Sequence, residues 1–290
     1  MKIAIIGPGA IGGTLAGWLS LHHDVTVCAR TPFERLVLET PGRTITATLP
    51  VLTDPRVLTE PVDWILATTK TYDTEAAAAW IASLRGPGTG VAVVQNGVEH
   101  LSRFPDVPNV LPVIIDIPAE KRGPGLILQR RNGDITAPEG ALGRAFCALF
   151  AGTDLRPTTT TDFTSAMWRK LALNTAGVVG AIVLQPEGIV HDRAAARLMS
   201  DITREAIAVG RAAGATLDDG LADEVVERLR AAPPETINSL LADRIAKRRT
   251  EIDARNGVIV RLGEQYGIPT PLNRMAVTLI DASHGTGKTE

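Results

Sequence analysis

The sequence predicts an α/β chain of two parts: an N-terminal Rossmann-type, doubly wound parallel sheet over residues 1–162 and a C-terminal all-helical domain over residues 163–290. Three observations support this division. Short apolar segments alternate with helical segments as far as residue 115, which is typical of parallel sheets. A glycine-rich turn directly follows the first apolar segment. After about residue 161, long segments with helical periodicity replace the alternation.

The elements of the first part are predicted from apolar runs and the turn residues that bound them. Residues 3–6 are expected to form a buried strand, residues 14–21 a helix and residues 24–29 a second strand. Further strands are expected over residues 63–69, 90–94 and 110–115, with a helix over residues 74–84. Residues 126–129 and 133–136 are expected to pair as a β-hairpin.

The second part is predicted to be built from helices. They are expected over residues 163–184, 191–213, 217–231, 239–266 and 272–281. Pro233-Pro234 and the two prolines within residues 267–271 break the helical pattern. Residues 285–289, Gly-Thr-Gly-Lys-Thr, resemble the end of a phosphate-binding loop, but Ala282 replaces its first glycine, so we expect a disordered tail there.

The glycine-rich turn has the spacing of a dinucleotide-binding loop between a strand and a helix. Gly7 would form the tight turn, Gly9 would let the backbone approach a pyrophosphate, and Gly12 would let the helix pack on the strand. The pyrophosphate would lie on the N–H groups of the helix N-terminus. A glycine-rich turn without a ligand is the alternative. The candidate cofactor loop comprises Gly7, Pro8, Gly9, Ala10, Ile11 and Gly12.

Arg30 follows the second predicted strand, where NAD-dependent enzymes place a carboxylate for the ribose 2′-hydroxyl. A guanidinium can instead hold a 2′-phosphate through charge-assisted hydrogen bonds, so the sequence predicts NADP(H). Arg35 could add charge, and Glu34, the only nearby acid in the sequence, is expected on a following helix that faces solvent. The alternative is that Arg30 is an ordinary surface arginine.

The composition argues against several other classes of protein. A net charge of −2 provides no basic surface for nucleic acid. No apolar run reaches the ~20 residues that cross a bilayer, and no signal peptide is recognised, so we expect no membrane partner and a cytoplasmic location. Cys28 and Cys147 are expected to be buried thiols, and no Cys/His cluster has zinc spacing, so no metal is expected.

Lys170 and Asn174 are four residues apart within the predicted helix 163–184, so both project from one face. Leu171, Ala172 and Leu173 surround them with apolar side chains. In such surroundings a lysine can serve as a proton donor near neutral pH. A lysine that lies at the edge of a core helix and extends its amine into solvent is the alternative.

A charged segment near residue 250 is a second candidate. Glu251 and Arg255 are at i,i+4 on the predicted helix 239–266 and could form only a surface ion pair. Asn238 or Ser239 could cap the start of this helix. Taken alone, the segment is typical of a solvated charged face.

Two polar loops follow predicted strands, Thr68-Thr69-Lys70 and Gln95-Asn96-Gly97. Both lie at carboxyl ends of strands, where ligands bind in open α/β sheets. Asn96-Gly97 could equally be a simple turn.

Together these segments resemble the ketopantoate reductase family (2-dehydropantoate 2-reductases), in order and approximate spacing, over nearly the whole chain. The segments that carry the resemblance are residues 7–12, 69–70, 95–97, 168–174 and 250–253. The resemblance implies an NADPH-dependent reductase of a 2-oxo acid, with ketopantoate, a precursor in pantothenate biosynthesis, as the leading substrate and pantoate as the product.

The resemblance also implies a role for each candidate residue. Lys170 corresponds to the general acid and Glu251 to the active-site carboxylate. The implied cofactor contacts outside the glycine-rich loop are Arg30, Lys70, Asn96 and Glu251. The implied substrate contacts are Lys170, Asn96, Asn174 and Ser239.

Two positions depart from the family pattern. Val178 stands four residues after Asn174, and Thr236 just before Ser239, where relatives often have substrate-binding asparagines. A lost polar anchor can change which substrate is accepted. A reductase of another 2-oxo or β-hydroxy acid and a non-catalytic NADP(H)-sensing protein are therefore the alternatives. The sequence leaves the oligomeric state open, with a homodimer as one option.

Overall fold

The computed structural model describes residues 1–57 and 60–283. The chain divides into two compact units. The first unit comprises Met1–Gln95 and Glu99–Phe163, and the second comprises Asn96–Val98 and the chain from Thr164 onward. The short segment Asn96–Val98 therefore belongs with helices that follow it much later in the sequence. The predicted tail at residues 285–289 lies outside the described residues.

A six-stranded parallel sheet forms the centre of the first unit. Its strands lie in the order β5 (Val51–Leu52), β2 (Asp24–Cys28), β1 (Lys2–Ile6), β6 (Trp64–Ala67), β7 (Gly90–Val93) and β8 (Val110–Pro112). The chain thus runs outward from β1 in one direction and then returns to continue on its other side, as in a doubly wound fold. The predicted fold class is confirmed.

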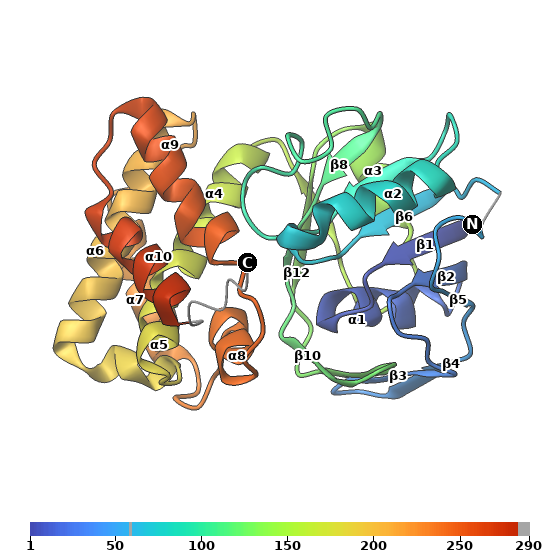
Figure 1. The fold of residues 1–290 in the computed structure, drawn as a ribbon, viewed down its shortest axis with the longest axis horizontal. Coiled ribbons are helices and arrows are strands. Elements are labelled where there is room, and N and C mark those ends of the chain that lie inside the picture. The colour runs from blue at the N-terminus through green and yellow to red at the C-terminus, as the bar shows by residue number, and fades with distance from the viewer. Residues whose placement is uncertain (58–59, 284–290) are drawn as a thin grey trace, which may run out of the picture. The chain divides into compact units, whose positions relative to one another are not determined.

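Two helices cover opposite faces of this sheet, as Figure 1 shows. Ile3 and Ile5 of β1 pack in one core with α1 (Ala10–Leu19), and Ala4 and Ile6 pack in another core with α2 (Thr74–Leu84). This alternation follows from the opposite directions of successive side chains in a strand. Because both faces are buried, residues 3–6 of this strand are all apolar, and only Lys2 at its start is exposed.

Two smaller sheets complete the first unit. One has the order β10 (Ala119–Gly123), β11 (Leu126–Gln129), β3 (Leu36–Glu39) and β4 (Thr44–Ala47). The other has the order β13 (Thr158–Thr160), β12 (Asp134–Pro138) and β9 (Ile114–Asp116). Helix α1 contacts both the parallel sheet and the four-stranded sheet. The remaining helical elements of this unit are η1 (Thr71–Asp73) and α3 (Ala141–Ala148).

Three expectations for this unit are wrong. The strand expected over residues 110–115 is two short strands, β8 and β9, which lie in different sheets. The strands predicted to form a hairpin, β11 and β12, lie in different sheets, and β11 instead pairs antiparallel with β10. The helix expected around Glu34 does not form. This exposed residue lies in the segment between β2 and β3, which contains no helix. In the case of the hairpin, β11 also pairs with β3, and β12 pairs with β9 and β13, and local residue patterns do not report such pairing of separated segments.

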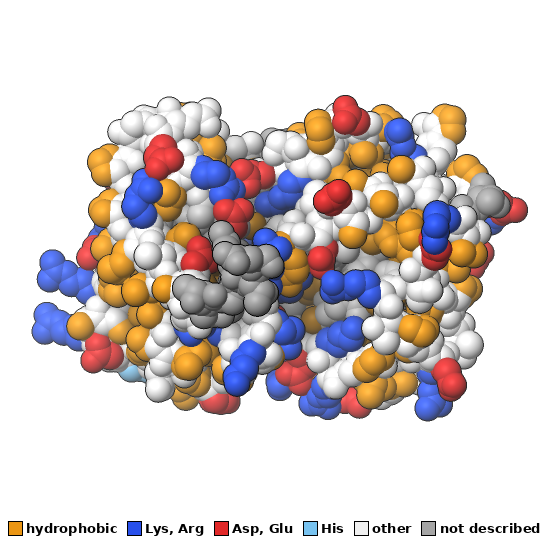
Figure 2. Space-filling model, viewed as in Figure 1, with side chains coloured by type: hydrophobic (Ala, Val, Ile, Leu, Met, Phe, Trp, Pro, Cys, Tyr) orange, Lys and Arg blue, Asp and Glu red, His pale blue; other side chains and the backbone are white. Residues whose placement is uncertain are grey.

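The second unit is helical and encloses one apolar core. Its elements are α4 (Phe163–Ala176), α5 (Val178–Val183), η2 (Glu187–His191), α6 (Arg193–Ala212), α7 (Leu221–Ala231), α8 (Ser239–Ile245), the π-helical turn η3 (Asp253–Gly257), α9 (Val258–Tyr266) and α10 (Pro271–Ser283). The predictions of single helices over residues 163–184 and 239–266 are wrong, since both are interrupted. On the face viewed in Figure 2, basic and acidic side chains are intermixed.

Candidate active site

Gly7 and Gly12 are required by the backbone geometry of the glycine-rich loop. Gly7 has φ +87°, and a Cβ there would lie 2.8 Å from Cγ2 of Thr69. A Cβ on Gly12 would overlap Oγ1 of Thr68 and the carbonyl oxygen of Gly7. These two glycines therefore permit the tight turn and the close approach of α1 to the strand ends.

Gly9 has a different environment. The nearest atom to a Cβ on Gly9 would be the carbonyl oxygen of Gly7, at 4.0 Å. The fold itself therefore leaves room for a side chain at this position. Helix α1 starts at Ala10 with no side-chain cap and no acidic residue in its first turn. Its first N–H groups have no acceptor within the helix, and the open space beside Gly9 fits the approach of a pyrophosphate to them.

Arg30 lies just beyond the end of β2, with 88% of its side chain exposed. Its Nη2 is 3.6 Å from Oδ2 of Asp73, so Asp73, not Glu34, is the acid near this guanidinium. Partial desolvation, and secondarily the charge of Arg30, lower the pKa of Lys121 on β10. Arg30 and Lys121 thus lie close enough to repel each other, and an anion bound there would relieve this repulsion.

The loops after β6 and β7 are joined by side-chain hydrogen bonds. Nε2 of Gln95 donates to Oγ1 of Thr69 at 3.0 Å. Oγ1 of Thr68 donates to the carbonyl oxygens of Ile6 and Gly7 at 2.9 and 2.8 Å. Lys70 follows directly and precedes η1. These loops lie at the carboxyl ends of β1, β6 and β7, beside the point where strand order reverses, which is the usual ligand site of such sheets.

Asn96 and Glu251 are brought together in the second unit. Nδ2 of Asn96 donates a hydrogen bond of 2.9 Å to Oε2 of Glu251. Gly97 has φ +95°, so the Asn96-Gly97 turn requires glycine at its second position. The segment is therefore a turn, and its Asn96 side chain also binds Glu251. Glu251 is only 4% exposed. The interpretation of its segment as a solvated charged face is therefore wrong.

Lys170 and Asn174 both lie on α4, one helical turn apart and half-buried. They share a face, as their spacing predicts. Helix α4 ends at Ala176, where Nδ2 of Asn238 donates to the carbonyl oxygen of Gly177 at 3.1 Å. A Cβ on Gly177 would lie 2.8 Å from this nitrogen, so glycine at this position leaves space for the Asn238 side chain between α4 and α5.

Val178 begins α5 and is fully buried in the apolar core of the second unit. The break at Gly177 separates it from α4. The expectation that Val178 continues the Lys170 and Asn174 face is therefore wrong, because that expectation assumed an unbroken helix. Its side chain packs among core residues and does not line a ligand-accessible surface in this structure.

Asn238, not Ser239, caps α8. Oδ1 of Asn238 accepts from the N–H groups of Leu240 and Leu241, each at 3.1 Å. Ser239 is the exposed first residue of the helix, and its Oγ lies 3.4 Å from Nη1 of Arg255. The cap therefore leaves the Ser239 hydroxyl to interact with Arg255.

Arg255 is a residue that the sequence interpretation placed on the surface. It is only 2% exposed, and its Nη2 donates to the carbonyl oxygen of Asn174. Its neighbour Asn256 is fully buried, and Nδ2 of Asn256 lies 3.4 Å from the carbonyl oxygen of Thr175. The last carbonyls of α4 lack partners within the helix, so these two side chains provide donors for them. Both residues lie in the π-helical turn η3, whose geometry differs from that of the regular helix expected here. Such turns are frequent at functional sites.

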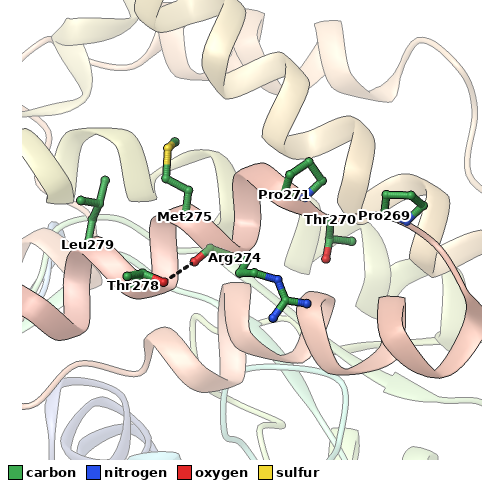
Figure 3. Close-up of a pocket in the computed structure, with 7 residues that line it drawn as sticks. All are labelled: Pro269, Thr270, Pro271, Arg274, Met275, Thr278 and Leu279. Carbon is green, nitrogen blue, oxygen red and sulfur yellow. Dashed lines mark hydrogen bonds between the residues drawn. The ribbon is translucent and has the colours of Figure 1, made fainter.

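A separate concavity of about 520 Å³ lies at the start of α10 (Figure 3). Its lining residues are Pro269, Thr270, Pro271, Arg274, Met275, Thr278 and Leu279. None of them is a candidate site residue. Oγ1 of Thr278 donates to the carbonyl oxygen of Arg274 at 3.0 Å, which is the dashed line in Figure 3. This surface is shallow and mostly apolar, and it carries no group suited to proton transfer.

Two other kinds of site are absent from the described residues. Within residues 1–57 and 60–283, no cluster of three or more His, Cys, Asp or Glu side chains is placed to hold a metal ion. In the same part of the chain, no helix is both long and apolar enough to span a membrane.

Comparison with known proteins agrees with this arrangement. Two family models match: Ketopantoate reductase PanE/ApbA over residues 3–142 and its C-terminal counterpart over residues 162–284. A 2-dehydropantoate 2-reductase of Caulobacter vibrioides is 54% identical over 287 residues, which cover 97% of this chain and 99% of the relative. The solved structure of a PanE/ApbA family ketopantoate reductase from Ralstonia eutropha has a TM-score of 0.90 at 30% identity, covering 98% of both chains.

A further similar structure is the ternary structure of D-mandelate dehydrogenase with NADH and anilino(oxo)acetate. It has a TM-score of 0.88 at 25% identity and covers 98% of both chains. The fold and these relatives define an NAD(P)-dependent oxidoreductase. The chain belongs to the ketopantoate reductase family, as the sequence resemblance predicted.

Proposed function

We propose that this protein reduces ketopantoate to pantoate with NADPH. The observation that carries the proposal is the joint presence of Lys170 and Asn174 on one face of α4 in the unit where Asn96 holds a buried Glu251. Reduction of a ketone needs a proton for the developing alkoxide, and a half-buried lysine can donate it. The curated relative from Caulobacter vibrioides is named for this reaction.

The proposed cofactor is NADPH rather than NADH. The loop from Gly7 to Gly12 would hold the pyrophosphate, and Arg30 with Lys121 would hold the 2′-phosphate. Lys70 and Asn96 are proposed as further contacts, and Glu251 as a residue near the reacting end of the cofactor. When bound, NADPH supplies the hydride that reduces the ketone carbon. The similar structure of D-mandelate dehydrogenase holds NADH, so the choice rests on the basic residues of this chain.

The proposed substrate contacts lie in the second unit. Lys170 would protonate the alkoxide oxygen, and Asn174 and Asn96 would orient the carbonyl and its neighbouring groups. Ser239 would help to bind the carboxylate. Glu251, whose orientation the Asn96 amide fixes, would hold a substrate hydroxyl or the Lys170 amine. Each role depends on alignment, which hydrogen bonds to the neighbouring residues maintain.

A second candidate is reduction of a different 2-oxo acid. The similarity to D-mandelate dehydrogenase with anilino(oxo)acetate favours it, because that ligand carries an aromatic group beside a 2-oxo acid. Thr236, where relatives often offer an amide, leaves fewer polar groups to bind the ketopantoate hydroxyl. A β-hydroxy acid as substrate, in the reverse direction, belongs to the same candidate.

The test is NADPH oxidation, followed at its absorbance band, with ketopantoate, phenylglyoxylate and a branched aliphatic 2-oxo acid. Highest kcat/KM for ketopantoate supports the proposal, and highest kcat/KM for another acid supports the second candidate. Tight NADPH binding without turnover of any acid would indicate an NADP(H) sensor instead. NADH in place of NADPH tests the cofactor in the same assay.

Two further parts of the proposal concern the protein's setting. We place it in the cytoplasm, where the free thiols of Cys28 and Cys147 would persist. We also propose a homodimer as the state to test, by light scattering over a range of concentrations.

A further inference from the structure

Arg255 connects two elements that carry proposed substrate contacts. Its Nη2 donates to the carbonyl oxygen of Asn174 on α4, and its Nη1 lies 3.4 Å from Oγ of Ser239 on α8. One rigid planar group therefore joins two positions that are far apart in the sequence. All three residues lie in the second compact unit.

The guanidinium stays charged although it is buried. Desolvation lowers the pKa of Arg255 to about 10, and the nearby carboxylates of Glu251, Asp243 and Glu187 act in the opposite direction. Arg255 is therefore a cation at neutral pH. Its place at the C-terminal end of α4 also suits the negative end of the helix dipole.

Burial of this charge is costly for an ordinary packing residue. Nε of Arg255 is buried and makes no hydrogen bond with any described residue. An apolar side chain of similar volume would avoid both the desolvation of the charge and the unpaired donor, and such replacements are often neutral or stabilising. An arginine at this position is therefore better explained by its bonds to Asn174 and Ser239 than by a contribution to the stability of the fold.

We propose that Arg255 is a positioning residue for substrate binding, which fixes the Asn174 backbone and the Ser239 hydroxyl relative to each other. The inference rests on the proposed roles of Asn174 and Ser239. A substrate that contacts both side chains binds more tightly when their separation is set in advance, because binding then orders fewer groups. Arg255 would thus act on KM for the 2-oxo acid and leave NADPH binding unchanged.

The test compares Arg255→Met, which keeps the volume but cannot donate, with Arg255→Lys, which keeps the charge but lacks the planar fork. Arg244→Met is the matched control. Nη1 of Arg244 also donates to helix carbonyls, those of Ala181 and Ile182 on α5, at 2.5 and 3.2 Å, and neither residue is a proposed contact. Each variant is measured for kcat, KM, NADPH dissociation constant and thermal unfolding.

Arg255→Met is expected to raise KM by about 10- to 100-fold, the range for loss of hydrogen bonds from a charged group. The NADPH dissociation constant should stay within about twofold, and Arg255→Lys should recover part of the loss. In Ser239→Ala, the additional effect of Arg255→Met on KM should shrink, because the two residues act together. Arg244→Met should lower only the unfolding temperature.

A merely structural role predicts that Arg255→Met behaves like Arg244→Met, with an unchanged KM, and this result would overturn the inference. If Arg255→Met does not fold, the KM of Arg255→Lys decides the question in the same way. If the wild type reduces no 2-oxo acid, the proposed function fails. Crystal structures of wild type and Arg255→Lys then decide the inference, since an unchanged position of Ser239 Oγ relative to the Asn174 carbonyl would refute it.

Discussion

Asn96 and Glu251 are 155 residues apart in the sequence, yet Nδ2 of Asn96 donates to Oε2 of Glu251 at 2.9 Å. The amide holds a carboxylate that is almost completely shielded from solvent. A buried carboxylate is costly without such partners, so the segment is not a solvated surface face, and Glu251 is a candidate functional residue.

Arg30→Ala is expected to weaken NADPH binding by about 1.5–3 kcal/mol, the range for a hydrogen bond from a charged group, and to leave NADH binding nearly unchanged. Fluorescence titration with both cofactors measures this. Arg122→Ala is the control, because Arg122 lies on β10 but pairs with Glu39 and Glu120. Equal losses for NADPH and NADH in Arg30→Ala would contradict the 2′-phosphate assignment.

Lys170→Ala is expected to lower kcat by about 10²–10⁴-fold, as for the loss of a general acid, with little change in NADPH binding. Steady-state kinetics and cofactor titration provide both values. Arg169→Ala is the matched control on the same helix, since Arg169 pairs with Asp218 at 2.5 Å. A folded Lys170→Ala protein with near-normal kcat would exclude lysine as the proton donor.

Gly9→Ala is expected to affect NADPH binding, whereas Gly12→Ala is expected to affect the stability of the fold. A Cβ at Gly9 meets no atom closer than 4.0 Å, so the fold should persist while NADPH affinity falls. A Cβ at Gly12 would overlap Gly7 and Thr68, so this variant should unfold at a lower temperature even without cofactor. Thermal unfolding with and without NADPH distinguishes the two. Unchanged NADPH affinity in Gly9→Ala would show that the pyrophosphate does not approach there.

Val178→Asn is expected to lower the free energy of unfolding by about 1–3 kcal/mol, because the amide would be buried in an apolar core without a partner. Val183→Asn on the same helix is the control, since Val183 is 49% exposed. Denaturant titration measures both. If Val178→Asn instead keeps the wild-type stability and changes substrate preference, the residue contacts the substrate.

Because of His100, the free energy of unfolding is expected to decrease as the pH falls. Its Nε2 donates to the carbonyl oxygen of Gln95 at 2.7 Å, and its Nδ1 is buried without a partner among the described residues. Burial, and then the charge of Arg103, lower its pKa from 6.5 to about 4. The unfolded chain therefore binds a proton that the folded chain excludes, so stability is lost as pH falls from about 6.5 towards 4.

The full loss for this single group is about 3 kcal/mol, from about 1.4 kcal/mol for each tenfold change in proton affinity. His100→Gln keeps a donor for the Gln95 carbonyl but does not titrate. Denaturant unfolding between pH 7 and pH 4 should therefore show a smaller decrease for this variant than for the wild type. The same decrease in both proteins would mean that other groups cause it.

Local patterns were sufficient for much of the first unit. Helix α2 begins and ends at Thr74 and Leu84, as the alanine-rich pattern predicts, and the strand before Gly7 lies where its apolar run predicts. Such features depend on neighbours within a few residues. The sequence also identified Lys170 and Asn174 as a pair, because their shared face follows from helical spacing alone.

The remaining features depend on contacts between distant segments. The break in the helix at Gly177 follows from a hydrogen bond with Asn238, which no local pattern reports. Glu251 and Arg255 have the spacing of a surface ion pair, and only the packing around them makes them buried. Gly257, which lies inside the helix expected over residues 239–266, is a local sign that this helix is irregular, because glycine is unfavourable in a helix interior.

The π-helical turn at Asp253–Gly257 makes this region sensitive to chain length as well as to side-chain identity. A π-turn holds one residue more than an α-helical turn, so deletion of a single residue would let the segment wind as an ordinary helix. Residues on one side of the deletion would then rotate by about 100° relative to the other side. Arg255 would lose the Asn174 carbonyl or Glu251 would lose Asn96, whereas substitution of the exposed Asp253 would disturb neither.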